Sequence, residues 1–503
     1  MNNGKICVSV CAATADELFG QIKRAEELAD VIELRFDCLR KNEIENAVGN
    51  LPKIDKPYLA TFRPKEQGGK RKLSLGERLK FWESLLRANK DKIFWVDFEF
   101  DMNFVINLQK TLTIASSHDF SGASENLSAT YEVFSITNAD VLKTAVQAYD
   151  ITDSIAVWKL LDRAKQDNKN IIPIAMGEAG KWTRILGLAH GAFMTYAAPD
   201  AGRETASGQI TTRDLIDTYH VKELDEQTEI YGIVGNPVSH SVSPFMHNAA
   251  FKLHDLNAVY IPFEVETLDE FIAKFIREET REIRLNFKGF SVTIPHKEAI
   301  IKHLDSIDET AKAIGAVNTV KIIGGKLHGY NTDAHGFIEP LINAYGGLKN
   351  AKVAVLGSGG AARAAIYGLR KEEAQVTVFA RNLEKGQSLA EQFKIQDSKF
   401  KTQNESYDDF DIVVNATPLG TIGELENKTP VVADQIKNVH LVYDLIYNPF
   451  ETRFLREAKS VGVPTVGGLA MLAAQGAAQF EIWTGKNAPL VEMSQIALRK
   501  LQS

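Results

Sequence analysis

The sequence is poor in cysteine. Its 503 residues include only three cysteines, Cys7, Cys11 and Cys38, and no two of them form a C-x-x-C pair. A small, odd number is typical of reduced thiols in a cytoplasmic core and argues against a disulfide framework. Cys7 and Cys11 share one face of an expected strand, so a metal pair is the alternative, but no histidine spacing accompanies them. We therefore predict that the protein has no metal site.

The sequence also lacks a long hydrophobic run and an excess of positive charge. No apolar stretch approaches the ~18–20 residues that a membrane span requires, and the first residues carry no basic leader. The formal net charge of −7 argues against general nucleic-acid binding, although local arginine and lysine side chains can still bind small anions. These absences predict a cytoplasmic protein with small-molecule substrates and with no nucleic-acid or membrane partner. No feature of the sequence indicates the oligomeric state.

Short β-branched runs alternate with helical patterns over about the first 215 residues. This alternation indicates βα units and a parallel sheet. Eight such units in this length predict a (β/α)₈ barrel. The expected strands are Lys5–Val10, Val31–Arg35, Tyr58–Thr61, Phe94–Glu99, Thr113–Ser117, Asp140–Thr144, Ile171–Ala175 and Phe193–Tyr196.

Polar residues fall at or after the ends of these expected strands, and barrel active sites lie at the carboxyl ends of strands. A single lysine in a strand usually points to solvent, but Lys143 has the apolar neighbours Leu142 and Ala145, and desolvation favours a neutral amine. A neutral amine can attack a ketone and form an iminium, and His118 can then move a proton from the adjacent carbon to a departing hydroxyl. The residues of this predicted cluster are Glu33, Arg35, Arg63, Glu99, His118, Lys143, Arg184 and Gln209.

The stretches around this cluster resemble type I 3-dehydroquinate dehydratases over about residues 5–215. The resemblance rests on KICVSV, IELRFD, TFRPKEQGG, VDFEF, SSHDF, ADVLKTAVQAYDITD, MGEAGKWTRILG and ASGQIT. It implies that Lys143 forms the Schiff base, that His118 is the general acid and base, and that Glu99 orients His118. Lys159 is a rival lysine, but it stands in the following helical pattern and is interpreted as a surface residue. The substrate-binding residues that the resemblance implies are Ser9, Glu33, Arg35, Arg63, Arg184, Gln209 and Thr205, the last replacing a serine of the family.

A glycine-rich turn lies in the second half of the chain. GSGGAAR, residues 357–363, follows an expected strand at Lys352–Leu356 and begins an expected helix. Gly357 permits the tight turn, and Gly359 lets the backbone approach a pyrophosphate at the helix N-terminus. The pattern therefore predicts a dinucleotide-binding Rossmann domain.

The residues after the next expected strand, Gln375–Phe379, indicate which dinucleotide binds. They are Ala380 and Arg381, with no acidic residue to bond the ribose hydroxyls. An arginine in this place can pair with a 2′-phosphate, so the sequence predicts NADP rather than NAD. A surface arginine at a strand end is the alternative.

Residues from about 229 to 490 resemble shikimate dehydrogenases, in GNPVSHSVSPFMHN, FSVTIPHKE, GAVNTV, GYNTDAHGF, NATPLG, DLIYNP and GGLAMLAAQGA. The resemblance implies that Lys297 and Asp333 are the catalytic pair. Hydride delivery leaves negative charge on the carbonyl oxygen, which suits Lys297, and Asp333 would hold that lysine in place. A structural ion pair is the alternative. By resemblance, Ser241, Ser243, Thr293, Asn318, Tyr447 and Gln475 bind the hydroxylated ring and its carboxylate, and Gly357, Gly359, Gly360, Ala361, Arg381, Leu445 and Gly468 line the cofactor.

The two resemblances together predict an α/β chain that catalyses two consecutive steps of the shikimate pathway. The barrel dehydrates 3-dehydroquinate to 3-dehydroshikimate, and the second half reduces that product to shikimate with NADPH. Two alternatives are that the second half acts on quinate, or that the chain is a non-catalytic metabolite-binding regulator. The expected parts are a TIM barrel at 1–218, a linker at 219–228, a substrate-binding domain at 229–335, a Rossmann NADP domain at 336–467, and C-terminal helices at 468–503 that return to the substrate domain.

Overall fold

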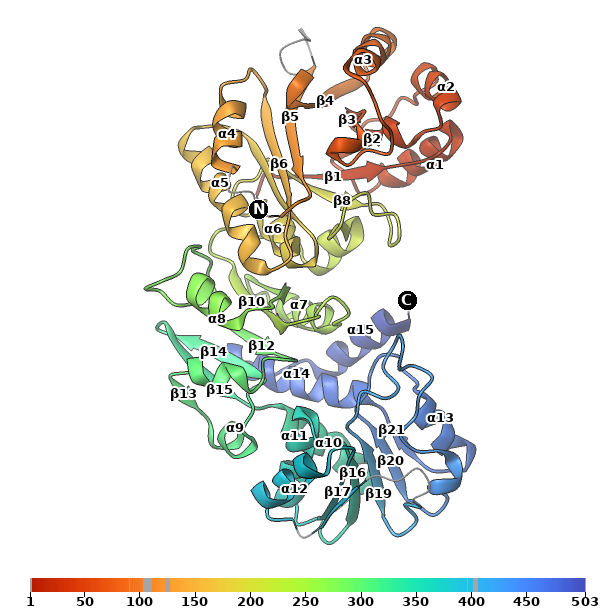
Figure 1. Cartoon of the computed structure of the whole chain (residues 1–503), viewed down its shortest axis with the longest axis vertical. Coiled ribbons are helices and arrows are strands. Elements are labelled where there is room, and N and C mark those ends of the chain that lie inside the picture. Colours follow the sequence, from red (N-terminus) through yellow and green to blue (C-terminus); the bar gives the residue numbers. More distant parts are fainter. Residues whose placement is uncertain are drawn as a thin grey trace. The chain divides into compact units, whose positions relative to one another are not determined.

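The computed structural model describes residues 2–89, 91–102, 111–122, 127–395, 397–400 and 406–502. The chain forms two compact units, and Figure 1 shows it coloured along the sequence. The first unit comprises Met1–Ile230, Asn236–Ser239 and Asn257–Asn286, and the second comprises Tyr231–Gly235, His240–Leu256 and Phe287–Ser503. In the part of the chain that is described, no helix is both long and apolar enough to cross a bilayer.

The first unit contains a barrel of eight parallel strands that follow one another around the sheet, with β9 beside β8. The pairs of neighbouring strands from β7 through β1 to β9 are all parallel. Between β7 and β8, the N–H of Phe193 donates to the carbonyl of Ile171 at 2.9 Å. The predicted barrel is therefore confirmed. Its strands are β1 Lys5–Val10, β2 Val31–Arg35, β3 Tyr58–Thr61, β4 Ile93–Glu99, β5 Leu112–Asp119, β6 Val141–Gln147, β7 Ile171–Met176, β8 Met194–Ala198 and β9 Ile210–Thr211.

Helices connect the strands of the barrel, as βα units require. The stretch 219–228, expected to be a linker, is fastened to this unit, because Nδ2 of Asn2 donates to the carbonyls of Val221 and Leu224 at 2.8 and 3.0 Å. The helices are α1 Ala15–Ala25, α2 Ile44–Gly49, α3 Leu75–Asn89, α4 Leu127–Ser135, α5 Ser154–Gln166 and α6 Lys181–Leu186. The segment 257–286 adds β11 Ala258–Glu264, α8 Leu268–Phe271 and the helical turn η8 Ile272–Ile276.

Apolar side chains form one buried cluster inside the barrel. Side chains alternate between the two faces of each strand, so every second residue points inward. Val141 and Ala145 belong to the buried interior cluster, together with Val31, Ile172 and Tyr196 from other strands. Lys143 lies between the first two in β6 and therefore shares their inward face.

The two strands that carry the predicted catalytic residues are longer than expected. β5 runs to Asp119, so His118 lies inside it rather than after it. β6 begins at Val141 and continues to Gln147, so Lys143 is its third residue rather than a late one. The parallel partner in β7 extends the sheet here, since Ala145, Val146 and Gln147 all pair with it.

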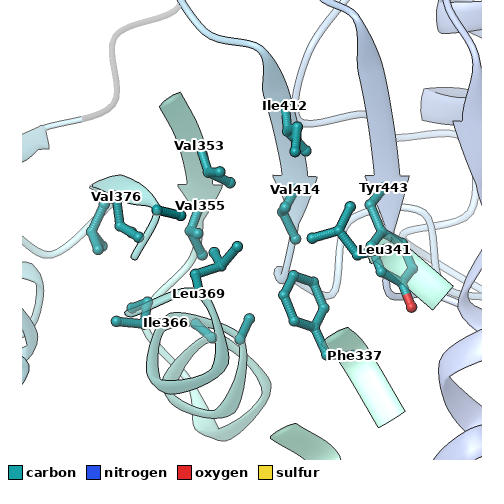
Figure 2. Close-up of a cluster of buried hydrophobic side chains, with 14 of the residues drawn as sticks. Phe337, Leu341, Val353, Val355, Ile366, Leu369, Val376, Ile412, Val414 and Tyr443 are labelled. Carbon is teal, nitrogen blue, oxygen red and sulfur yellow. The ribbon is translucent and has the colours of Figure 1, made fainter. Parts of the chain in front are cut away.

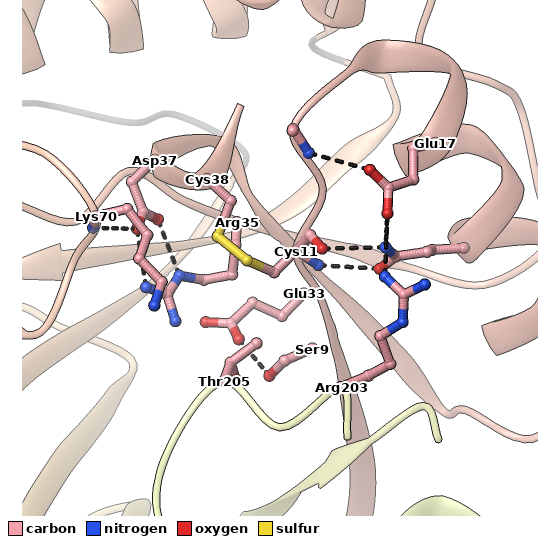
Figure 3. The surroundings of a disulfide bond; sticks show 12 residues. Ser9, Cys11, Glu17, Glu33, Arg35, Asp37, Cys38, Lys70, Arg203 and Thr205 are labelled. Carbon is pink, nitrogen blue, oxygen red and sulfur yellow. Dashed lines mark hydrogen bonds and ion pairs between the residues drawn. A yellow bond between two sulfur atoms is a disulfide. The ribbon is translucent and has the colours of Figure 1, made fainter. Parts of the chain in front are cut away.

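The prediction of three reduced thiols is wrong. Cys11 and Cys38 form a disulfide with a Cα–Cα distance of 5.5 Å, whereas Cys7 is free and buried in the barrel interior. Cys11 follows β1, and Cys38 lies in the turn that follows β2 (Figure 3). Because β1 and β2 are neighbouring parallel strands, the two cysteines meet at the same edge of the sheet. This closeness depends on the pairing of the strands, which the cysteine spacing does not reveal.

The second unit contains a sheet in which β10 and β12 are parallel, β12, β14 and β15 are antiparallel neighbours, and β13 lies parallel to β15. Two long C-terminal helices, α14 and α15, belong to the same unit. Its strands are β10 Glu229–Gly235, β12 Gly289–Val292, β13 Ser306–Ile307, β14 Thr319–Ile323 and β15 Lys326–Tyr330; its helices are α7 Ser243–Leu253, α9 Glu309–Ile314, α10 Asp333–Tyr345, α14 Gly468–Thr484 and α15 Leu490–Gln502.

A parallel sheet in the order β18-β17-β16-β19-β20-β21 completes this unit. Val353 and Val355 of β16 pack on one face against Ile366 and Leu369 of α11 (Figure 2), while Ala354 and Leu356 join a second buried cluster on the other face. Burial on both faces is typical of a doubly covered Rossmann sheet. The strands are β16 Lys352–Leu356, β17 Gln375–Ala380, β18 Asp397–Phe400, β19 Ile412–Asn415, β20 Leu441–Asp444 and β21 Thr465–Val466, and the helices are α11 Gly360–Lys371, α12 Leu383–Gln392 and α13 Arg453–Ser460.

Candidate active sites

A cavity of about 120 Å³ lies among the carboxyl-terminal residues of the barrel strands and the loops that follow them. It brings together every barrel residue predicted to act in the site except Glu99, which borders a neighbouring cavity of about 630 Å³. The predicted residues that line the smaller cavity are Ser9, Glu33, Arg35, Arg63, His118, Lys143, Arg184, Thr205 and Gln209.

Lys143 is 3% exposed. Its Nζ lies 2.9 Å from Oδ2 of Asp97 and 3.9 Å from the ring centroid of Tyr196. Burial is the largest influence on the pKa of Lys143 and lowers it; the attraction of Asp97 opposes this effect, and the charge of Arg63 adds to it. The net result is a lowered pKa, which favours the neutral, nucleophilic amine.

His118 is held at two points. Its backbone N–H donates to Oε1 of Gln67 at 2.9 Å, and its ring Nε2 lies 2.7 Å from Nη1 of Arg63. A guanidinium can only donate, so Nε2 accepts this bond and the imidazole is neutral. Burial lowers the pKa of His118 well below its ordinary value, and the charges of Arg63 and Lys143 lower it further. A neutral imidazole is the form that a general base requires.

Glu99 reaches His118 through Arg63. Its carboxylate accepts from Nε of Arg63 at 3.4 Å and from Nη1 of Arg78 at 3.0 Å. No direct hydrogen bond joins Glu99 to His118 among the residues described. Arg63 donates to both groups, so any orienting effect of Glu99 on the imidazole passes through the guanidinium.

Arg184 has the features of an anion-binding side chain. It is 2% exposed on α6, and its Nη2 donates to the carbonyl of Ser207 at 3.5 Å. Its Nε and Nη1 are buried without a hydrogen-bond partner in the described part of the chain. Burial lowers the pKa of Arg184 to about 10, so the guanidinium is still charged at neutral pH. A buried charge with unused donors suits a carboxylate ligand.

Hydrogen bonds to hydroxyl and backbone groups also fix Glu33 and Gln209 in the lining of this cavity. Glu33 accepts from Oγ of Ser9 at 2.5 Å and from Oγ1 of Thr61 at 2.8 Å. Oε1 of Gln209 accepts from the backbone N–H of Thr205 at 2.7 Å and from its hydroxyl at 3.2 Å. The hydroxyl of Thr205 therefore lies in the lining of the cavity, where the resemblance implied a serine.

Asp97 and Tyr196 are residues of this site that were not predicted. Asp97 binds Lys143 and also forms an ion pair with Arg63, whose Nη2 lies 2.7 Å from its Oδ2. Although burial opposes its ionisation, Arg63 and Lys143 hold the pKa of Asp97 well below its ordinary value. Tyr196 supplies the ring beneath the amine. Asp97 precedes Glu99 by two residues in one strand, and this period-2 spacing is the signal that could have revealed it.

A second cavity, of about 180 Å³, lies in the second unit. It is lined by all the residues predicted to bind the hydroxylated ring and by the predicted catalytic pair. Three of the residues predicted to line the cofactor, Ala361, Leu445 and Gly468, border it as well. The predicted ring-binding and catalytic residues in its lining are Ser241, Ser243, Thr293, Lys297, Asn318, Asp333, Tyr447 and Gln475.

Lys297 and Asp333 form the ion pair expected of a catalytic pair. Nζ of Lys297 lies 2.5 Å from Oδ2 of Asp333. Oδ1 of that carboxylate accepts from Nδ2 of Asn318 at 2.8 Å, and the same amide nitrogen also donates to Thr332 at 2.9 Å. Asp333 is 7% exposed in its side chain, and Lys297 is 21% exposed. The amine thus faces the cavity while the carboxylate behind it is fixed.

Gln479 is a further residue that the sequence did not indicate as part of this site. Its Oε1 accepts from Oγ of Ser291 at 2.8 Å, and its Nε2 donates to the carbonyl of Asn318 at 3.2 Å and to Oγ1 of Thr319 at 3.0 Å. Gln479 follows Gln475 by four residues on α14, so both amides lie on one face of the helix. This face joins α14 to the sheet beneath the cavity.

The glycine-rich turn between β16 and α11 fits a dinucleotide phosphate. Gly357 has φ +124°, and a Cβ there would lie 2.7 Å from the carbonyl oxygen of Ala416, so the turn itself requires glycine. Gly359 is the N-cap of α11, has φ −89°, and no protein atom lies within 4 Å of a Cβ placed on it. The fold therefore does not require glycine at this position, whereas a phosphate approaching the helix N-terminus does. Arg381 is exposed and follows the end of β17, next to this turn in the sheet.

Sequence profiles of known families match both halves of the chain. The profile described as Type I 3-dehydroquinase matches residues 6–226. Three further profiles follow: Shikimate dehydrogenase substrate binding domain at residues 233–320, Shikimate / quinate 5-dehydrogenase at 342–443, and Shikimate 5'-dehydrogenase C-terminal domain at 468–498.

Individual relatives agree with these matches. The bifunctional 3-dehydroquinate dehydratase/shikimate dehydrogenase of Arabidopsis thaliana, a chloroplastic protein, is 34% identical over 97% of this chain and 83% of its own length. An NADP(+) shikimate dehydrogenase of Methanococcus maripaludis is 42% identical over 56% of this chain and its full length. A crystal structure of a shikimate dehydrogenase in complex with NADP+ superposes with a TM-score of 0.51 at 39% identity, over 56% of this chain and 98% of its own. The chain therefore belongs to the family of bifunctional 3-dehydroquinate dehydratases/shikimate dehydrogenases, as the sequence predicted.

Proposed function

We propose that the barrel dehydrates 3-dehydroquinate through a Schiff base on Lys143. The neutral amine attacks the ketone carbon, water leaves, and the resulting iminium acidifies the neighbouring carbon. His118 takes a proton from that carbon and returns it to the departing hydroxyl, which leaves as water. Hydrolysis of the iminium then releases 3-dehydroshikimate and restores the amine. The net change is the loss of one water molecule from the substrate.

The observation that carries this proposal is a buried lysine and a neutral histidine in one small cavity. Arg63 is bonded to the histidine, and the same lining holds a buried Arg184 whose Nε and Nη1 have no partner among the described residues. An aliphatic amine with a lowered pKa gives the nucleophile, and the unused donors of Arg184 suit the substrate carboxylate. Glu33, Ser9 and Gln209 can bind the hydroxyls of the ring.

We also propose that the second cavity reduces 3-dehydroshikimate to shikimate. When bound, NADPH supplies the hydride that reduces the ketone carbon. Lys297 donates a proton to the carbonyl oxygen as negative charge develops there, and Asp333 keeps the amine in place. Serine, threonine, asparagine and glutamine side chains bind the hydroxylated ring by neutral hydrogen bonds. The cofactor is NADP, as predicted from Arg381 and supported by the NADP+-dependent relatives.

Borohydride reduction in the presence of 3-dehydroquinate, followed by peptide mapping, tests the barrel assignment. The expected adduct is on Lys143. Lys159 is the internal control, since it lies on α5 with its side chain 52% exposed and paired with Glu282. An adduct on Lys159, or no adduct, contradicts the proposal.

A Lys297→Ala variant tests the second cavity. It is expected to keep dehydratase activity and to lose reduction of 3-dehydroshikimate by roughly 10²-fold or more, the range for loss of a general acid. Loss of both activities, or of neither, contradicts the assignment. Oxidation of quinate, assayed beside that of shikimate, distinguishes the alternative substrate.

Location in the cytoplasm remains a prediction from the sequence and forms part of this proposal. Structural disulfides are uncommon in reducing compartments such as the cytoplasm, so the Cys11–Cys38 bond argues against this location. Cell fractionation tests the location, and thiol labelling of the protein in rapidly acidified cells measures the fraction in which this bond is formed.

A further inference from the structure

Arg35 and Asp37 form a bidentate ion pair beside the barrel cavity. Nε of Arg35 donates to Oδ1 of Asp37 at 2.9 Å, and Nη2 donates to Oδ2 at 2.8 Å (Figure 3). The side chains are 6% and 0% exposed. Only Arg35 lines the cavity; Asp37 lies behind it. The pairing leaves Nη1 of Arg35 without a hydrogen-bond partner among the described residues, so this donor group is available to a ligand.

Asp37 and Arg35 are also bonded to the loop that contains Gly68, a residue of the cavity lining. Its Oδ2 accepts from the backbone N–H of Lys70 at 3.0 Å, and Nη2 of Arg35 donates to the carbonyl of Gly68 at 3.4 Å. Burial opposes the ionisation of Asp37, but Arg35 attracts its charge, and the net effect lowers the pKa of Asp37. The carboxylate is therefore ionised at neutral pH and fixes the plane of the guanidinium.

The disulfide fixes the turn that carries Asp37. Asp37 lies in the 3₁₀ turn Phe36–Cys38, which directly follows β2, and Cys38 bonds to Cys11 at the end of β1 (Figure 3). Cys11 is itself anchored, because its N–H donates to Oε1 of Gln21 at 3.1 Å and its carbonyl accepts from Nε2 at 3.0 Å. Without the disulfide, the turn Phe36–Cys38 loses its covalent link to Cys11, the residue that follows β1.

We propose that Asp37 is a positioning residue for Arg35 and that the Cys11–Cys38 disulfide, by fixing their turn, makes substrate binding by the dehydratase sensitive to reduction. The proposal rests on the proposed role of Arg35 in binding 3-dehydroquinate. A dithiol would break the S–S bond: two electrons and two protons pass to the sulfurs of Cys11 and Cys38, and the dithiol becomes a disulfide. Both cysteines are partly exposed, so a reductant can reach them.

The dehydrogenase of the same chain is a built-in control. All three cysteines of the sequence precede residue 39, and none lies in the second unit. Reduction of the disulfide therefore changes the first unit alone. An effect of reduction on both activities would point to general damage rather than to the turn.

The first experiment compares steady-state constants of three variants of the full chain. In Asp37→Asn, the amide can accept only one of the two bonds from Arg35, so KM for 3-dehydroquinate is expected to rise roughly tenfold while kcat stays within about twofold. Arg35→Lys should raise KM at least as much, because it removes the planar fork. The control Asp140→Asn removes a carboxylate that binds Thr113 at the opposite, amino-terminal end of β5 and should leave both constants unchanged.

These variants separate two kinds of failure. If Arg35→Lys leaves KM unchanged, the proposed role of Arg35 in substrate binding is wrong. If Arg35→Lys raises KM but Asp37→Asn does not, the role of Asp37 is wrong. A fall in kcat of Asp37→Asn without a rise in KM also overturns it, since a positioning residue of the ground-state complex acts on KM.

The second experiment needs no substitution in the ion pair. Treatment with dithiothreitol, with loss of the disulfide verified by thiol titration, is expected to raise KM of the dehydratase roughly threefold or more and to leave the dehydrogenase unchanged. Reoxidation should restore KM. The double variant Cys11→Ser, Cys38→Ser should have the raised KM under all conditions, and dithiothreitol should not change that KM further. An unchanged dehydratase KM in both the reduced protein and the double variant overturns the redox part of the proposal.

Discussion

Lys143 and Asp97 lie side by side in the interior of the barrel, with Nζ of the lysine 2.9 Å from Oδ2 of the aspartate. The same oxygen lies 2.7 Å from Nη2 of Arg63. One carboxylate thus contacts both the amine and a guanidinium, in a place where burial favours the neutral form of the amine. Asp97 and burial act on the lysine in opposite directions, and the balance between them sets the pH range in which the amine can react.

The first prediction concerns Asp97→Asn. The aspartate raises the pKa of Lys143, whereas burial and Arg63 lower it. Its removal should therefore lower the pKa of the lysine further, and the acid limb of the pH profile for borohydride trapping should move to lower pH. The same profile measured for Asp140→Asn is the control. A limb that stays in place or moves to higher pH would falsify the assigned role of Asp97.

The second prediction compares two glycines of the phosphate turn. Gly359→Ala places a methyl group where no protein atom lies within 4 Å, so its thermal stability should match that of the wild type to within about 0.5 kcal/mol. The methyl group would stand where a phosphate approaches the helix, so KM for NADPH should rise roughly tenfold or more.

Gly357→Ala serves as the contrasting variant. It forces a side chain onto φ +124° and to within 2.7 Å of a carbonyl oxygen, so it should destabilise the second unit by about 1–3 kcal/mol. Thermal unfolding and cofactor titration of both variants separate the two effects. A Gly359→Ala protein with normal NADPH binding would contradict the assignment of this turn to the cofactor.

The third prediction concerns the choice of cofactor. Arg381 is exposed at the end of β17, and a charge-assisted bond to a 2′-phosphate contributes roughly 1.5–3 kcal/mol. Arg381→Ala should therefore raise KM for NADPH by about ten- to a hundredfold and leave KM for NADH within about twofold. Arg370→Ala, at the last turn of α11, is the matched control. Equal losses with both cofactors would show that Arg381 does not read the 2′-phosphate.

Much of this architecture could be predicted because local signals agree with the fold. The bounds of β1, β2, β3 and β16 match the expected strands, since β-branched runs there are bounded by clear breaks. The barrel site could be predicted because polar residues at successive strand ends meet at one rim. Glu33, Arg63 and Gln209 illustrate this, since they come from distant parts of the sequence and line one cavity.

What the sequence did not reveal depends on contacts between elements. The Cys11–Cys38 bond requires that β1 and β2 be neighbours in register, and no spacing rule encodes that pairing. Arg63 was expected to bind substrate, but its position between Glu99 and His118 depends on the direction of a long side chain. The sequence did contain a clue to Asp97 and Gln479. Asp97 lies two residues before Glu99 in a strand, and Gln479 lies four residues after Gln475 in a helix, so each shares a face with a residue that was predicted.

The last prediction concerns a buried acid in the Rossmann sheet. Asp444 ends β20, and burial raises its pKa to about 6, although Thr452, Ile446 and Asn415 donate hydrogen bonds that oppose the shift. A carboxyl whose pKa is raised in the folded state contributes stability that is fully present below the unfolded value of 3.8 and is lost as the pH rises through about 6. The gap between these values corresponds to about 3 kcal/mol once both states are ionised.

Asp444→Asn cannot ionise and should escape this loss. Compared with the wild type, the variant should lack a bond at pH 4.5 and be less stable, because the amide accepts with only one oxygen. Its relative stability should then rise by about 2 kcal/mol as the pH increases to 7.5, because the unfolded carboxyl is already mostly ionised at pH 4.5. The midpoint temperature for loss of dehydrogenase activity measures this difference. Asp434→Asn, an exposed acid of the same unit paired with Lys437, should show no such trend, and a difference between Asp444→Asn and wild type that is independent of pH would rule out a raised pKa at Asp444.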